Sequence, residues 1–328
     1  MKGITIVLML LFVFLTSALA VTTPRRVPSS NTALNLSLLT NASDLASPIP
    51  PPGYEILLQF DETILLNPLG VYINALELMY RLAQFDWDLF IYGDIPMSAT
   101  TYNIWIVVAS VTSGQLKVSY AVIALHDSII AMARLPAFFR LSALISLDGQ
   151  RIGHLEFGRK DGPSDSDTSI SSAEDTLLIV NNNQSEGSWS NSGQIVDPYD
   201  SKFIVTYDFY GKAIDSKEIF TVALDGLAIS AQFKASEDCP VLEASSMSGV
   251  AAISISKVLG VPTQLRYSDV TKSLLIIVTG VIVPQRKFKE VEFSISYDGV
   301  KIAEGYMLKL ALGENVTKGI AASKREWT

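Results

Sequence analysis

The sequence predicts an α+β fold made of two tandem, diverged copies of one β-α-β-β-α-β-β module, each an antiparallel or mixed sheet covered by two helices. Two internal similarities carry this prediction. The strand-like segment Ile56–Asp61 resembles Phe203–Asp208 at an offset of 147 positions, and the segment around Asp148-Gly149 resembles that around Asp298-Gly299 at an offset of 150. An offset that drifts so little across a module indicates a tandem duplication.

The first copy is expected to span residues 53–158. Its first helix should start at Asn67-Pro68, because Asn favours the N-cap and Pro favours the first helical position. Asp148-Gly149 predicts a two-residue type I′ turn in the closing hairpin. The expected elements, in order, are strand 55–60, a helix from residue 67, strands 104–110 and 115–119, a helix near 121–135 stopped by Pro136, and strands 139–147 and 150–157.

The second copy is expected to span residues 203–312. The segment 270–283 is rich in β-branched residues and by itself would favour a strand, but alignment with the first copy favours a helix. The order of elements resembles a ferredoxin-like unit with one added strand. The expected elements are strand 203–209, a helix capped at Asp215-Ser216-Lys217-Glu218, helix 270–283, and strands 289–297 and 300–308.

The N-terminus is typical of a signal peptide over residues 1–20. Lys2 supplies the positive charge, an apolar stretch follows, and Ala18-Leu19-Ala20 gives the cleavage pattern. That stretch is too short to span a membrane, and the apolar run Leu274–Val283 is interpreted as a core element. We therefore expect a secreted, extracellular protein without a membrane span.

Composition sets the remaining boundaries. Residues 21–52 should form a disordered arm rich in Ser, Thr and Pro, and Arg25-Arg26 within it is either a dibasic processing site or a pair of solvated arginines. Residues 159–202 predict an acidic linker rich in Ser and Asn, with a short strand at 177–180, around which the two copies should fold separately. Residues 313–328 form a tail. Four sequons predict N-glycosylation, at Asn35, Asn41, Asn183 and Asn315.

The closing segments, such as Phe139–Phe157, combine a preceding helix with a hairpin that has Gly in its turn. In this they resemble secreted proteins of filamentous fungi. The resemblance covers both copies loosely and implies an extracellular location, but it supplies no activity and no functional residues.

Charge and cysteine content exclude some classes of function. The net charge of −8 argues against a nucleic-acid partner. Cys239 is the only cysteine, so an intramolecular disulfide is excluded. It is interpreted as a buried, inert thiol, with a nucleophile or an intermolecular disulfide as the alternatives. Asp86-Trp87-Asp88 resembles a short metal-binding acidic pair but is interpreted as a helix terminus, so no metal site and no cofactor are expected.

The candidate catalytic residues are Asp61, Asp208, His126 and His154. The two aspartates end the first strand of each copy, where sites of α/β proteins often lie, although Asp also favours turns. His126 falls on the second helix, where a core-edge histidine is the alternative to a catalytic one. His154 alternates with Glu156 on a hairpin strand and could equally form a surface pair. The G-x-S-x-G, H-E-x-x-H, Walker and G-x-G-x-x-G motifs are absent.

Aromatic residues crowd the segment between the first helix and the next strand of the first copy. If they are exposed they could stack on sugars or bind a protein, and if buried they cover the sheet. Trp105 lies in an apolar strand and is expected in the core, while Trp87 lies between two aspartates and is expected at the surface. The candidate binding residues are Trp87, Tyr92 and Tyr102.

These observations favour a non-catalytic secreted protein that binds an extracellular partner or glycan, mainly through its first copy. The alternative is a secreted hydrolase of unfamiliar type. Its carboxylate or His–carboxylate site would lie at the interface between the two copies, where side chains from distant segments converge.

Overall fold

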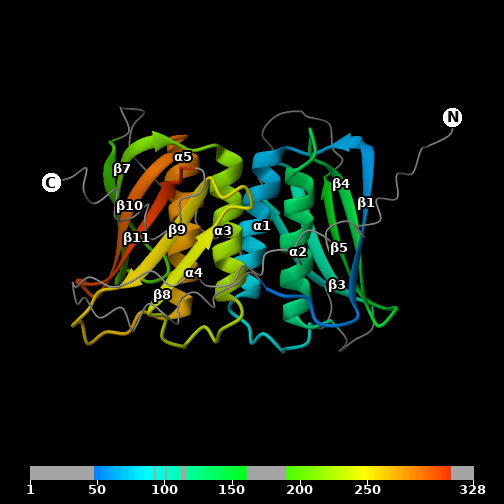
Figure 1. Cartoon of the computed structure of the whole chain (residues 1–328), viewed down its shortest axis with the longest axis horizontal. Coiled ribbons are helices and arrows are strands. Elements are labelled where there is room, and N and C mark those ends of the chain that lie inside the picture. Colours follow the sequence, from blue (N-terminus) through cyan, green and yellow to red (C-terminus); the bar gives the residue numbers. More distant parts are fainter. Residues whose placement is uncertain (1–47, 92–93, 100–101, 112–115, 161–189, 312–328) are drawn as a thin grey trace, which may run out of the picture.

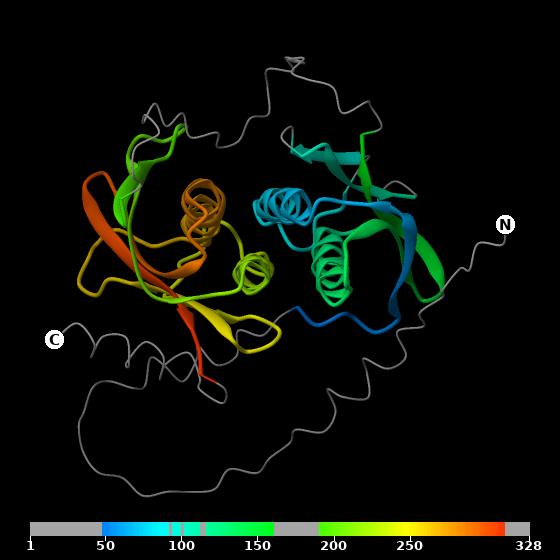
Figure 2. The same cartoon turned by 90° about the horizontal axis from the view of Figure 1, so that it is seen from above.

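A computed structural model describes residues 48–91, 94–99, 102–111, 116–160 and 190–311. Two antiparallel sheets form the outer layers, and the helices lie between them (Figure 1). Seen from above, α1 and α2 of the first module face α3 and α4 of the second (Figure 2). The α+β class predicted from the sequence is confirmed.

Within the described residues, the first module contains one five-stranded sheet and two helices. The sheet has the order β1-β4-β5-β3-β2, and each neighbouring pair is antiparallel. Its elements are β1 (Tyr54–Leu65), α1 (Pro68–Leu82), β2 (Asp94–Ala99), β3 (Ile104–Ser110), α2 (Val118–Ala133), β4 (Phe139–Leu147) and β5 (Gln150–Arg159).

The strand expected at residues 115–119 is wrong, because α2 already begins at Val118. Leu116 and Val118 alternate as in a strand and both are buried. Their backbone groups bond instead with the segment that precedes β2: the Ile91 N–H donates to the Leu116 carbonyl at 2.7 Å, and the Val118 N–H donates to the Leu89 carbonyl at 2.8 Å. Among the described strands, β3 pairs with β2 and β5.

The second module has one six-stranded sheet of order β6-β7-β10-β11-β9-β8. The helix predicted at 270–283 is confirmed, and it runs from Tyr267 to Gln285. Its elements are β6 (Ser192–Val196), β7 (Phe203–Ala213), α3 (Ser216–Ser230), β8 (Val241–Ser245), β9 (Ala251–Lys257), α4 (Tyr267–Leu275), the π-helical turn η4 (Ile276–Ile282), α5 (Val283–Gln285), β10 (Lys289–Tyr297) and β11 (Val300–Lys309).

The predicted linker 159–202 is too long, because β6 lies within it and pairs with β7. Ile195 is the reason: it pairs with Val205 and is buried in the core, so this short strand covers part of the sheet despite its polar flanks. The strand expected at 177–180, the terminal arm and tail, the signal peptide, Arg25-Arg26 and all four sequons lie outside the described residues.

Helix starts follow the expected capping chemistry. The Asn67 side chain accepts from the Gly70 N–H at 3.2 Å, and the Asp215 side chain accepts from the Lys217 N–H at 2.8 Å. Glu218 does not return to its own N-cap as a capping box would require, because its carboxylate bonds with the Ser248 hydroxyl.

Both closing hairpins have the predicted two-residue turns. Asp148 and Gly149 have φ values of 51° and 74°, and Asp298 and Gly299 have 52° and 78°, as a type I′ turn requires. The ferredoxin-like order is wrong, however. In that fold the first and third strands are neighbours, whereas here the hairpin β4–β5 is inserted between β1 and β3.

Strand register also corrects the sequence alignment of the two modules. Tyr54 pairs with Leu147 and Phe203 pairs with Tyr297, so the first strands are related by an offset of 149 rather than 147. A slip of two residues keeps every side chain on the same face of a strand, so the hydrophobic pattern cannot reveal it. Consequently Asp61 and Asp208 are not equivalent: Asp208 corresponds to Gln59.

The modules share one hydrophobic core that extends through the helical layer. Tyr72 of α1 stacks on Phe220 of α3, with ring centroids 4.6 Å apart and planes 7° from parallel. On another side of the interface, the Gln84 amide donates to the Thr271 hydroxyl at 3.1 Å. This shared core is at odds with two separately folding units.

By length and composition, the helix Tyr267–Gln285 could cross a membrane. However, 67% of its most apolar 18-residue stretch is buried inside the protein. Its π-helical turn ends at Ile282, two residues before Pro284. Proline lacks an N–H and clashes with the carbonyl four residues earlier, so a wider turn there relieves the clash.

Candidate functional site

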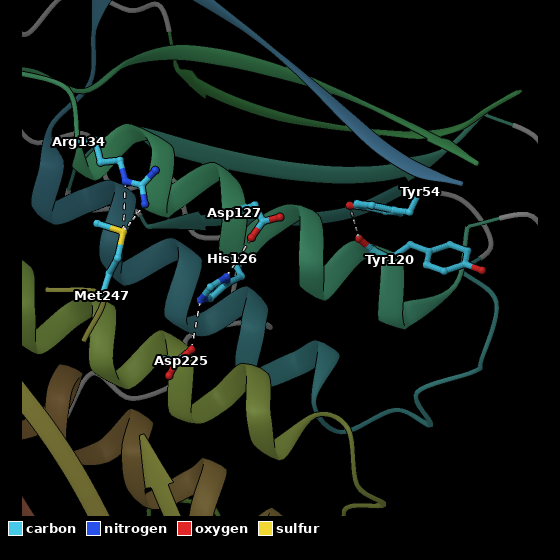
Figure 3. A network of polar contacts seen from close by, with 7 residues as sticks. All are labelled: Tyr54, Tyr120, His126, Asp127, Arg134, Asp225 and Met247. Carbon is cyan, nitrogen blue, oxygen red and sulfur yellow. Dashed lines mark hydrogen bonds and ion pairs between the residues drawn. The ribbon is translucent and has the colours of Figure 1, made fainter. Parts of the chain in front are cut away.

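The four candidate catalytic residues do not converge. Asp61 and His154 lie on the outer face of the first sheet, and Asp208 lies on the outer face of the second. His126 projects from α2 into the interface between the modules (Figure 3). Because the helical layer separates the two outer faces, Asp61 and Asp208 cannot act on one substrate.

The Asp61 carboxylate takes part in a local turn at a β-bulge of β1. Its carboxylate accepts from the Thr63 hydroxyl at 2.5 Å and from the Thr63 N–H at 3.1 Å. These hydrogen bonds lower the pKa of Asp61 below its ordinary value. Asp208 lies in the middle of β7, between Ser192 of β6 and Glu292 of β10, rather than at the end of the strand as expected.

His126 is held between two carboxylates (Figure 3). Its Nδ1 is 3.2 Å from Asp127 of the same helix, and its Nε2 is 3.4 Å from Asp225 of α3. The side chains of His126 and Asp225 are only 15% and 13% exposed. Burial by itself lowers the pKa of His126, but the hydrogen bonds to Asp127 and Asp225 outweigh it and raise the pKa from 6.5 to about 9.

This arrangement makes His126 an imidazolium at neutral pH. Both ring nitrogens must carry protons to donate to the two carboxylates, so neither is left to accept a proton from a substrate. The module interface therefore holds a His–carboxylate cluster, as the hydrolase hypothesis requires, but its protonation suits an ion pair that joins α2 to α3. Nearby, the Arg134 guanidinium also reaches across the modules, to the Met247 sulfur at 2.8 Å.

His154 is on β5 between Leu144 of β4 and Ala109 of β3. Its Nδ1 is buried, and no described residue hydrogen-bonds to it. The surface pair with Glu156 suggested by the sequence does not form an ion pair within the described part of the chain. In the second module the equivalent position is Glu304, since the hairpins are related by an offset of 150.

The candidate aromatic residues are placed differently from the expectation. Trp87 and Tyr102 are partly buried and pack against the core. Trp105 is not in the core: Ile104 and Ile106 point inward, so strand alternation turns Trp105 to the outer face, where its ring covers Gly158. The side chain of Tyr92 lies outside the described residues.

We expect Trp87→Ala to be the more destabilising of the two Trp substitutions. Removing a ring that packs on the core costs roughly 3 kcal/mol or more, whereas Trp105→Ala uncovers only a glycine on an outer face and should cost about 1 kcal/mol. Urea unfolding followed by far-UV circular dichroism measures both. Equal losses of stability would show that Trp105 is also part of the core.

Cys239 is buried, as interpreted from the sequence. Burial is the main reason that its pKa rises to about 12, against the opposing hydrogen bond with Tyr267. A thiol with so high a pKa carries almost no thiolate at neutral pH, so it is a poor nucleophile. Among the described residues, no group of three or more His, Cys, Asp and Glu side chains could hold a metal ion.

No protein-family model matches this sequence, and no curated protein matches it either. Among solved structures, the tandem DUF26 ectodomain of the Arabidopsis thaliana cysteine-rich receptor-like protein PDLP8 matches with a TM-score of 0.22 and 11% identity, covering 77% of this chain and 97% of that one. The corresponding ectodomain of PDLP5 matches with a TM-score of 0.20 and 9% identity, covering 75% and 95%. Similarity at this level carries no conclusion about fold or function.

Proposed function

We propose that the protein is a secreted, non-catalytic binding protein built from two diverged copies of one module, and that the outer sheet face of the first module is its binding surface. The observation that carries the proposal is a difference in chemistry between the two outer faces. A common origin of the modules is supported by their shared order of elements and by the matching registers of their hairpins.

Equivalent rows cross the two sheets. In the first module the row is largely apolar, whereas in the second it is hydroxylic and acidic. No helix covers either row in the described part of the chain. The first row consists of Leu57, Leu144, His154 and Ala109, and the second of Thr206, Ser294, Glu304 and Ser256.

Several polar groups of the second outer face interact with one another. The Tyr306 hydroxyl lies 3.4 Å from Glu292 and 3.5 Å from Glu304, and Lys301 pairs with Glu304 at 2.8 Å. The first face places Trp105 and Val107, both partly exposed, beside this row, in which Leu57 is 37% exposed and Ala109 is buried. Apolar side chains exposed together on one face are typical of interaction sites.

The chemistry of the first face suits a ligand with both apolar and hydroxylic surfaces. The Trp105 ring offers a flat apolar platform, and Glu156 lies on the neighbouring strand as a hydrogen-bond acceptor. The C–H face and hydroxyls of a sugar ring match this combination. We therefore name a neutral extracellular polysaccharide as the partner class.

Retention of the purified protein on immobilised cellulose, chitin and laminarin tests this function. Trp105→Ala should weaken retention on the bound polysaccharide by about tenfold or more. Thr206→Ala is the matched control, because it replaces an outer-face residue of the second module and should leave retention unchanged. Equal weakening by both variants, or retention on none of the three polysaccharides, contradicts the proposal.

The hydrolase alternative is separated in the same assay by measuring released reducing sugar. Turnover that His126→Gln abolishes, in a protein whose circular dichroism spectrum is unchanged, would assign catalysis to the module interface. We expect no release of sugar from any of the three polymers, because His126 has no free ring nitrogen to accept a proton.

A further inference from the structure

Strand β1 forms one edge of the first sheet and pairs only with β4 among the described strands. Edge strands usually carry a Lys, a Pro, a bulge or a very short length, any of which prevents pairing with another chain. The other edges follow this rule: β6 and β8 have five residues each, and β2 contains Pro96. β1 has none of these protections between Glu55 and Phe60, since its bulge comes only after Asp61.

Apolar side chains are partly exposed to solvent on both faces of this edge strand. Leu57 on the outer face is 37% exposed. Ile56 and Phe60 point toward the core, yet both are only partly buried, because no strand lies beyond β1 in the described structure. A further strand added at this edge would bury all three side chains.

We propose that β1 pairs in antiparallel fashion with β1 of a second copy of this chain, with Leu57 facing Leu57 across a two-fold axis. The contact joins two five-stranded sheets into one continuous sheet. It is isologous, so it closes as a dimer and does not propagate.

Charge and face together select this register. With Leu57 on the axis, Glu55 faces Gln59 on the outer face, and Ile56 faces Leu58 on the inner face. The Gln59 amide can donate to the Glu55 carboxylate, and no two carboxylates are opposed. The apolar inner pairs extend the core across the axis.

Other registers of the two paired β1 strands oppose less favourable residues. A shift of the axis to Leu58 brings Glu55 opposite Asp61, and like charges directly opposite one another are destabilising. A shift to Ile56 leaves Gln59 and Phe60 beyond the paired segment, opposite Gly53 and the residue before it. A half-step shift places inner-face residues opposite outer-face residues, which a continuous sheet does not allow.

The net charge of −8 predicts how the dimerisation depends on salt concentration. Two copies repel each other at low ionic strength, so salt should strengthen the association by screening that repulsion. A basic peptide bound at the same edge, beside Glu55 and Asp61, would show the opposite dependence, because salt would weaken its attraction. The salt dependence therefore distinguishes a second copy from a basic partner.

Sedimentation of the full chain over roughly 1 to 100 µM tests the dimer. Wild type should sediment increasingly as a dimer, while Leu57→Lys and Leu57→Glu should each remain monomeric because like charges meet on the axis. Mixing the two variants should restore a heterodimer, since opposite charges then face each other. The control is Leu65→Lys, which alters a residue that is 57% exposed beyond the bulge and should dimerise as wild type does.

Disulfide trapping tests the register independently. Leu57→Cys should form a disulfide-linked dimer on mild oxidation, because the two Cα atoms would lie about 5 Å apart. In Gln59→Cys each new cysteine faces position 55 of the other copy. The two thiols are then about four residues, or roughly 13 Å, apart along the strand, so no linked dimer should form. Buried Cys239 should not interfere. A monomeric wild type at all concentrations, a dimeric Leu57→Lys, or equal trapping at both positions overturns the proposal.

Discussion

Replacing His126 with glutamine is expected to lower the free energy of unfolding by about 3 kcal/mol at neutral pH. The substitution removes the cation between Asp127 and Asp225 and leaves the poorly exposed Asp225 carboxylate without its charged partner across the interface. Breaking a largely buried ion pair by removing one member typically costs about 3–5 kcal/mol. We place the loss at the lower end because the side chains are not fully buried.

The pH dependence of stability identifies the same interaction. The pKa of His126 rises from 6.5 to about 9 on folding, so its contribution is fully present below pH 6.5 and is lost as the pH rises through 9. The wild type should therefore lose up to about 3 kcal/mol between pH 6 and pH 10 through this group. His126→Gln should lack this part of the loss, and the two proteins should converge in stability at high pH.

Urea unfolding of both proteins at pH 6, 8 and 10 measures this difference. His154→Gln is the matched control, because it removes the other histidine from an outer sheet face where no carboxylate pairs with it in the described structure. If His126→Gln and His154→Gln had the same small effect, the ion pair between α2 and α3 would not stabilise the protein.

Phe220→Ala is expected to cost about 3–5 kcal/mol and to loosen the contact between the modules. The ring is buried against Tyr72 of the other module, so its removal leaves a cavity at their interface. The matched control is Tyr72→Phe, which keeps the stacked ring. Since no described residue hydrogen-bonds to the Tyr72 hydroxyl, its loss should leave stability unchanged or slightly increased.

A specific protease site introduced within residues 161–189 turns this prediction into a test of module independence. After cleavage, the wild type and Tyr72→Phe should still migrate as one particle in gel filtration, because the shared core holds the halves together. Cleaved Phe220→Ala should separate to a much greater extent. Two separate halves from the cleaved wild type would restore the view of independent modules.

Local sequence patterns were sufficient for the elements whose stability is local. Asn67-Pro68 marked the start of a helix, and each Asp-Gly pair marked a type I′ turn, because caps and tight turns depend on a few neighbouring residues. The β-branched helix at Tyr267–Gln285 could be predicted only through its alignment with the first module.

The candidate site depends on contacts between distant residues, which local sequence patterns cannot predict. His126 could be singled out from the sequence because it is one of two histidines, but Asp225 had no signal linking it to His126 almost a hundred positions earlier. Trp105 was expected in the core because its strand is apolar, although alternation within that strand turns its ring outward.

The sequence by itself determined the α+β class, the hairpins and the starts of α1 and α3, because hydrophobic period and capping act within short segments. Only the tertiary structure decided that β6 completes the second sheet, that β4–β5 is inserted between β1 and β3, and that the modules share a core. It also decided that Asp208 corresponds to Gln59 rather than to Asp61. Strand order and a two-residue register leave the inward and outward pattern of each strand unchanged, so only contacts between distant segments fix them.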